Sequence, residues 1–245
     1  MNQISNNLFI EQKNNICIVR FNNLENVEDL FSKKTIQEIE NLCKDQNIIL
    51  LLFILENKKD IPINNQLSEN LIEQKESLKN FFYKMTIPSV VLIDGICKDI
   101  YLEFALLCDM RLCSSSSKIV FPEYKSNNFI DERLFTLCGQ RKFELMKKYF
   151  GKDTSITDLS ETNFINLVLN SENYLNEALE FCNKIIINRT RLRVETITKC
   201  LNAYKDYYNY SNDIIMMEEE VKQFCWLVYK DFHKNSNQDG EVLNG

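Results

Sequence analysis

The sequence predicts an α/β fold with a helical C-terminal region, and three observations carry this prediction. Strand-like and helix-like apolar patterns alternate along the chain as far as Phe121. From Asp131 onward, apolar residues recur mainly at helical spacing. The chain has 245 residues with 44% hydrophobic content, which is enough to bury a full core. We therefore expect strand-helix repeats that form one sheet-containing domain, followed by helices.

The N-terminal part is predicted to form a hairpin, a helix and a buried strand. Residues 8–21 alternate between apolar and polar on both sides of Lys13-Asn14-Asn15, which is typical of a hairpin. Apolar residues then follow Ser32 at helical spacing, and Ser32 is a suitable helix cap. Residues 48–56 form a continuous apolar run, which indicates a strand buried on both faces. A strand-helix-strand unit of this kind favours a right-handed crossover.

The middle of the chain is predicted to contain three strands and two helices. Turn-forming residues lead to Asn65, and the helix that follows must end before Pro88, because the residue before proline avoids helical angles. A buried strand then starts at Pro88, and a helix is expected over residues 99–108. Two short strands are expected over residues 110–113 and 118–121, with Asp109 and Arg111 forming a structural polar pair between elements.

The C-terminal part is predicted to be helical apart from one short strand in "NFINLVL". Its last helices carry more apolar residues between positions 214 and 229 than one amphipathic stripe needs, which favours packing on a neighbouring subunit. We therefore divide the chain into a core over 1–190, a C-terminal helical oligomerisation region over 191–233 and a disordered tail over 234–245.

Composition and charge exclude several classes of function. The net charge of −6 argues against nucleic acid or an anionic membrane as the main partner, since both are polyanions. The nine cysteines contain no CxxC pair and lie mostly in apolar runs, which indicates buried, reduced thiols in a cytoplasmic protein. The N-terminus lacks the pattern of a signal peptide, and the longest apolar run is too short to span a bilayer.

Cofactor chemistry is not indicated by any motif. His233 is the only histidine and lies near the C-terminus, which argues against a His-based triad or a His-rich metal site. No G-x-G-x-x-G follows a strand, so the sequence predicts no bound metal, flavin or nicotinamide.

One block, from Pro88 to Glu123, carries motifs in a specific order. A proline-led strand, "PSVVLIDG", precedes a helix with a glutamate, "YLEFALLCD", and then come "CDMR" and "FPE". This block resembles the crotonase superfamily, the enoyl-CoA hydratase and isomerase family, and can be laid on that family's pattern without gaps. The resemblance implies a crotonase-like spiral of repeated β-β-α units, with subunits assembled as trimers or hexamers.

The resemblance also implies site residues and a substrate class. The two catalytic glutamates of the family fall on Glu103 and Glu123, which would position one water and move its proton. Two close carboxylates suit this work, because they do not both hold full charge cheaply and one can act as the acid. The substrate would be an acyl thioester, carried by CoA or by an acyl carrier protein as in crotonase-like enzymes of polyketide assembly.

The chain departs from the family pattern where the family uses glycine. Asp99, Ile100 and Tyr101 stand where members have consecutive glycines, so Ile100 would be the oxyanion-hole donor and Tyr101 would line the substrate site. The second donor belongs to "NKKDIPINNQLSE", which contains no glycine. Its candidates, suggested only by their position along the chain, are Ile63, Asn64 and Asn65. Together with Tyr101, these residues form the expected substrate-binding set.

Two functions remain open from the sequence, beside the plain alternative of an α/β domain with accidental motif similarity. The first is an active lyase or isomerase that hydrates, dehydrates or isomerises an enoyl thioester through a stabilised enolate, and retention of Glu103 and Glu123 favours it. The second is a catalytically impaired crotonase-fold subunit with a binding or assembly role, and the loss of glycines favours it.

Overall fold

The computed structural model describes residues 2–3, 8–21, 32–57, 69–159 and 161–210. Contacts divide the chain into two compact units, residues 1–199 and residues 200–245. Of the second unit only residues 200–210, the end of helix α8 (Arg191–Tyr210), are described. The predicted oligomerisation region and tail lie largely outside the described residues, as do Cys225 and His233.

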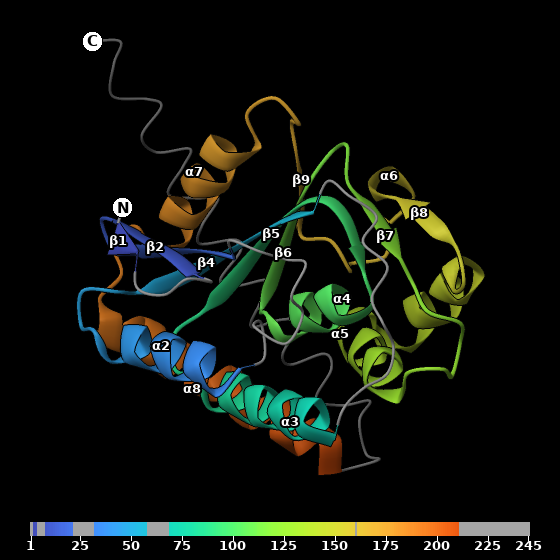
Figure 1. Cartoon of the computed structure of the whole chain (residues 1–245), viewed down its shortest axis with the longest axis horizontal. Helices are drawn as coiled ribbons and strands as arrows, with labels where there is room; N and C mark the ends of the chain where they lie inside the picture. The colour runs from blue at the N-terminus through green and yellow to red at the C-terminus, as the bar shows by residue number, and fades with distance from the viewer. Residues whose placement is uncertain (1, 4–7, 22–31, 58–68, 160, 211–245) are drawn as a thin grey trace, which may run out of the picture. The chain divides into compact units, whose positions relative to one another are not determined.

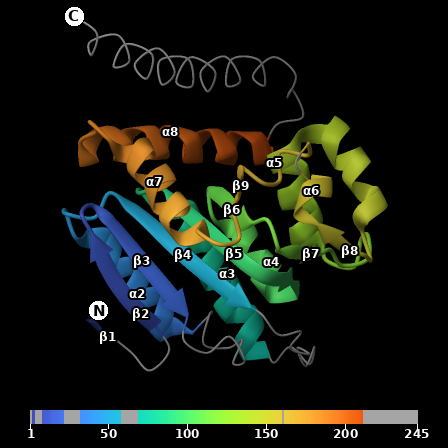
Figure 2. The same ribbon diagram turned by 90° about the horizontal axis from the view of Figure 1, so that it is seen from above.

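The first unit is built around a twisted sheet. Its strands are β1 (Asn2–Gln3), β2 (Leu8–Lys13), β3 (Ile16–Phe21), β4 (Leu50–Asn57), β5 (Ser89–Lys98), β6 (Met110–Ser114), β7 (Lys118–Val120), β8 (Asp153–Ser155) and β9 (Leu167–Leu169). The main path runs β1-β2-β3-β4-β5-β6-β9, as Figure 2 shows for its central strands. The strands β1 to β3 pair antiparallel, whereas β3, β4, β5, β6 and β9 pair parallel.

Helices cover both faces of this sheet. They are α2 (Lys33–Lys44), α3 (Glu69–Lys84), α4 (Asp99–Leu107), α5 (Asn128–Met146), α6 (Ile156–Leu159) and α7 (Tyr174–Ile186), with a 3-10 turn η1 (Lys147–Tyr149). One core cluster joins α2, α3, α4 and α5 to one face, and a second joins α7 and the start of α8 to the other. Figure 1 shows α7 and the pair α2 and α3 on opposite sides of the strands.

Local signals in the sequence explain several of these elements. The predicted hairpin is confirmed, and its turn places Asn14 at a φ of 55°. Ser32 caps α2 as predicted, since its side chain accepts a hydrogen bond from the Thr35 N–H at 3.2 Å. β5 bends at Gly95, whose φ of 106° suits a residue without a Cβ. Before this bend β5 pairs with β6, and after it β5 pairs with β7.

Two buried arginines hold the C-terminal end of α4. Arg133 donates from Nε and Nη2 to the Leu106 carbonyl, at 3.1 and 2.9 Å. Arg111 donates to the carbonyls of Cys108 and Phe164, at 2.9 and 2.7 Å. Burial lowers the pKa of Arg111 to about 10, so it stays charged at neutral pH. The carbonyls of Leu106 and Cys108 lie at the end of α4, where the helix itself leaves them without partners.

The predicted polar pair of Asp109 and Arg111 needs a correction. The Asp109 carboxylate accepts hydrogen bonds from the Ser89 N–H and hydroxyl, at 2.9 and 2.8 Å. Arg111 donates mainly to main-chain carbonyls instead. Both residues are therefore structural, and their direct contact is a hydrogen bond of 3.5 Å from Nη2 of Arg111 to the main-chain carbonyl of Asp109.

Other elements match the sequence to different degrees. The strands and helix predicted between Pro88 and Phe121 are present as β5, α4, β6 and β7. β9 confirms the strand in "NFINLVL", whereas β8 was not predicted. Six of the cysteines are buried, as expected from their apolar surroundings: Cys17, Cys97, Cys108, Cys113, Cys138 and Cys182. No helix in the described part of the chain is long and apolar enough to cross a membrane.

Candidate functional site

The helix α4 places Glu103 inside the protein. It starts directly after β5, and every residue from Ile100 to Leu107 is buried. Glu103 is 7% exposed, although its neighbours on the helix are apolar. A buried carboxylate needs compensating partners, because removing it from water without them costs several kcal/mol, on the order of 2–7 even for a neutral polar group.

Lys75 and Asn127 supply these partners. The Lys75 ammonium lies 2.9 Å from Oε2 and 3.1 Å from Oε1 of Glu103, and the two side chains are only 13% and 9% exposed. The Asn127 amide Nδ2 donates to Oε1 of Glu103 at 2.7 Å. Both carboxylate oxygens are therefore engaged, and the negative charge is balanced by an adjacent cation.

Sequence reasoning missed Lys75, although its position carries a signal. Lys75 stands three residues before Leu78 and seven before Phe82, both of which are buried in the core. This spacing puts Lys75 on the apolar face of α3. A lysine on a buried helix face needs an acidic partner, and that partner is Glu103.

Asn127 links the start of α5 to α4. Its Oδ1 accepts from the Ile130 N–H at 3.2 Å and so caps α5, while its Nδ2 donates to Glu103. One side chain thereby satisfies a helix terminus and a buried charge. The sequence signal was an asparagine just before an apolar helical run, and it went unused.

Glu123 has different surroundings. It follows Pro122 after β7, as predicted, but its side chain is exposed. Its carbonyl accepts from the Ser126 N–H at 2.9 Å, which closes a turn. Its Cγ lies 3.6 Å from the Cβ position of Gly151, whose N–H donates to Phe121 and Pro122 carbonyls. Among the described residues, none forms a hydrogen bond or ion pair with the Glu123 carboxylate, and none joins it to Glu103.

The remaining predicted site residues are placed as follows. Ile100 is the second residue of α4, so helix geometry leaves its N–H without an acceptor inside the helix. Its side chain is 3% exposed and packs in the core, as does that of Tyr101 at 1%. Ile63, Asn64 and Asn65 lie outside the described residues. The oxyanion hole and the substrate contacts therefore stay predictions.

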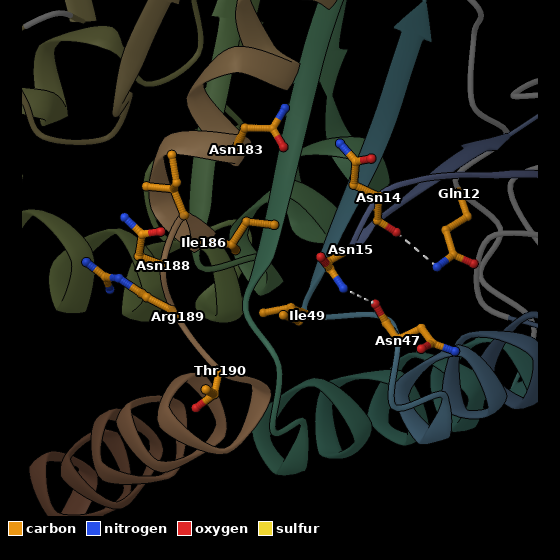
Figure 3. A pocket seen from close by; sticks show the side chains of 11 residues that line it. Gln12, Asn14, Asn15, Asn47, Ile49, Asn183, Ile186, Asn188, Arg189 and Thr190 are labelled. Carbon is orange, nitrogen blue, oxygen red and sulfur yellow. Dashed lines mark hydrogen bonds between the residues drawn. The ribbon is translucent and has the colours of Figure 1, made fainter.

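A separate hollow lies at the amino ends of β3 and β4. It has a volume of about 830 Å³ and is lined largely by amide side chains, and Figure 3 shows Asn15 directed toward Asn47 and Gln12 toward Asn14. It shares no lining residue with the surroundings of Glu103. Ligands of sheets with parallel strands bind at the carboxyl ends, so this hollow is not our candidate site.

Metal binding finds no support in the described part of the chain. No three His, Cys, Asp or Glu side chains gather there in a way that could hold an ion. The expectation that the protein uses no metal, flavin or nicotinamide remains a prediction.

Among known proteins, only solved structures match this chain. No family model and no curated protein matches the sequence significantly. Solved structures do match. DspI from Pseudomonas aeruginosa is 16% identical, with 97% of this chain and 95% of that chain covered and a TM-score of 0.67. An enoyl-CoA hydratase subunit from Geobacillus kaustophilus is 17% identical over 95% and 93%, also with a TM-score of 0.67.

A third match carries the family name. A Legionella pneumophila protein assigned as an enoyl-CoA hydratase/isomerase (crotonase) is 15% identical over 92% of this chain and 91% of that chain, with a TM-score of 0.65. Identities this low show the fold alone. With the motifs between Pro88 and Glu123, they show that this chain has the crotonase fold.

Proposed function

We propose that this chain is a catalytically impaired crotonase-fold subunit with a binding or assembly role. The observation that carries the proposal is the buried contact between Lys75 and both oxygens of Glu103. A carboxylate offers about four acceptor positions. Lys75 and Asn127 together occupy three of them, so Glu103 has little capacity left to hold a water in position.

The surroundings of Glu123 support the same proposal. Hydration by two glutamates needs both carboxylates to contact one water, which limits them to hydrogen-bond reach of a shared point. Glu103 is buried against α3 and α5, whereas Glu123 is exposed beside Gly151. Two groups in such different surroundings are poorly arranged to divide acid and base roles at one substrate carbon.

A second function is favoured by one specific observation, namely that Glu103 is buried at the position where the family resemblance implies a catalytic glutamate. Moving a double bond in an enoyl thioester needs only one base. It takes a proton from one carbon to give an enolate and returns it to another carbon. Glu103 could do this alone, with the enolate oxygen bound by the Ile100 N–H. The substrate would be an acyl thioester on CoA or on an acyl carrier protein.

Turnover of a small panel of enoyl-CoA and enoyl-carrier thioesters tests both functions. Hydration is followed by loss of enoyl absorbance, and isomerisation by analysis of the products. The impaired subunit gives no rate above the uncatalysed one, with Glu103→Gln indistinguishable from the unchanged chain. Isomerisation that disappears in Glu103→Gln and persists in Glu123→Gln would replace our first proposal with the second. Hydration by the unchanged chain that disappears in both Glu103→Gln and Glu123→Gln would refute our first proposal in favour of the two-glutamate reaction.

A further inference from the structure

The hollow at the amino ends of β3 and β4 lies between two walls. One wall comes from the hairpin β2–β3 and the residues just before β4, and the other comes from the end of α7 and the segment that leads into α8 (Figure 3). Its volume of about 830 Å³ is within the range of small-ligand pockets. The position of this hollow argues against an active site, but side chains can bind a ligand there without the carboxyl ends of the strands.

Arg191 holds the two walls together. It is the first residue of α8, and its guanidinium donates to the main-chain carbonyls of Asp45 and Ile48, which lie just before β4. Its Nε also pairs with Glu195 at 2.7 Å. The segment that forms the second wall is thereby fixed to the chain beside the first wall. The hollow is therefore formed before a ligand enters, which lowers the cost of binding.

Arg189 is the only charged side chain among the described residues that line the hollow. In the described part of the chain, no carboxylate forms an ion pair with Arg189 or with Arg193, which stands four residues later. Burial and the nearby Arg193 lower the pKa of Arg189, but an arginine stays charged at neutral pH. Two neighbouring guanidinium groups without an acidic partner favour the binding of an anion.

Amide side chains supply much of the neutral lining. Figure 3 shows Asn183 and Asn188 on one wall and Asn47 on the other. In the described chain, these three side chains form no hydrogen bond with another residue. An amide both donates and accepts hydrogen bonds, as a hydroxyl group does, so these side chains suit a ligand with several hydroxyls. Ile49 and Ile186, each 8% exposed, add apolar surface that suits the C–H groups of a sugar ring.

We propose that this hollow binds a small sugar phosphate, with its phosphate at Arg189 and its hydroxyl groups at the amide side chains. A phosphate monoester carries about 1.5 to 2 negative charges at neutral pH, so it suits two neighbouring guanidinium groups better than a carboxylate does. A neutral sugar would leave the charge of Arg189 unbalanced, and inorganic phosphate would leave the amides without partners. The hollow shares no lining residue with the surroundings of Glu103, so the proposal does not depend on the function of that residue.

Calorimetric titration of the full chain with ribose 5-phosphate, glucose 6-phosphate and fructose 6-phosphate tests the proposal. At least one should bind saturably, and about tenfold or more tightly than both inorganic phosphate and the same sugar without its phosphate. Glucuronate, which replaces the phosphate by a carboxylate, should bind more weakly than the sugar phosphate that binds best.

Arg189→Met should raise the dissociation constant of that sugar phosphate about tenfold or more, because it removes a charge-assisted hydrogen bond. The matched control is Arg141→Met, which replaces an exposed arginine outside the hollow and should leave the dissociation constant unchanged. The Arg189 side chain forms no hydrogen bond with a described residue, so Arg189→Met should melt no lower than the unchanged chain.

The proposal is overturned if none of the three sugar phosphates binds saturably. It is also overturned if inorganic phosphate or glucuronate binds as tightly as the best sugar phosphate, since the hollow would then hold any anion. Equal dissociation constants for Arg189→Met and Arg141→Met would show that the ligand binds elsewhere and would overturn it as well.

Discussion

Glu103 and Glu123 are the same residue type in one motif block, but they occupy contrasting regions of the molecule. Glu103 is buried on α4, where Lys75 and Asn127 contact its carboxylate. Glu123 is exposed after β7 with no ion pair to a described residue. The motif thus determines where in the fold each glutamate is placed. Residues outside the motif, here on α3 and at the start of α5, decide what that carboxylate can do.

The largest expected effect comes from removing the cation beside Glu103. Lys75→Met should lower the free energy of unfolding by about 3–5 kcal/mol, because it leaves a buried charge without its partner. Urea denaturation measures this loss. The double variant Lys75→Met/Glu103→Gln removes both charges and should be destabilised by less than the sum of the single variants, with a coupling of roughly 0.5–3 kcal/mol. Simple additivity would show that the pair is not coupled.

Asn127 is expected to matter more than an ordinary helix cap. Ser32→Ala should cost about 1 kcal/mol, as loss of a capping side chain usually does. Asn127→Ala loses both a cap and a hydrogen bond to a buried carboxylate, so it should cost about 1.5–3 kcal/mol more. Urea denaturation of the two variants under identical conditions compares their losses in the free energy of unfolding. Equal losses would mean that the contact with Glu103 adds nothing.

Burial of the Cys113 thiol should make the free energy of unfolding depend on pH in the alkaline range. Burial raises the pKa of Cys113 from 9.0 to about 12, so the folded state keeps a proton that the unfolded state loses. Its contribution to stability is complete below pH 9 and is lost as the pH rises toward 12. Between pH 9 and 10 the loss should be about 1 kcal/mol. In Cys113→Ala, the fall in the free energy of unfolding between pH 9 and 10 should be smaller by this amount. An unchanged fall would contradict the raised pKa of Cys113.

The smallest effect is expected at the exposed glutamate. Glu123→Gln should change the free energy of unfolding by no more than about 0.5 kcal/mol, as is usual for surface substitutions. It is the matched control for Glu103→Gln, which disturbs the buried pair. If Glu123→Gln destabilised the protein as much as Glu103→Gln, the contrast between the two regions would be wrong.

Local patterns predicted much of the fold. The hairpin around Asn14, the cap at Ser32 and the strand-helix order after Pro88 all depend on neighbours in sequence, and all are present. β8 has the polar sequence DTS, so it lacks the apolar residues that indicated the equally short strands β7 and β9. The buried arginines and their carbonyl partners depend on contacts between distant segments, which periodicity does not encode.

The burial of Glu103 was predicted from the sequence, but its partners were not. The motif located Glu103 correctly on a buried helix, yet its partner Lys75 stands 28 residues earlier. The neighbouring positions of Glu56 and Asp94 were hidden as well, because only the register between β4 and β5 brings the two residues together.

The bend of β5 at Gly95 has a consequence for how the protein opens. Residues 90–93 of this strand hydrogen-bond to β6, whereas residues 96–98 hydrogen-bond to β7. One continuous strand therefore belongs to two ladders, and displacing β5 from the sheet breaks both of them. In amide hydrogen exchange, protons in both ladders should be released in the same cooperative opening, and β5 should be among the last segments to exchange.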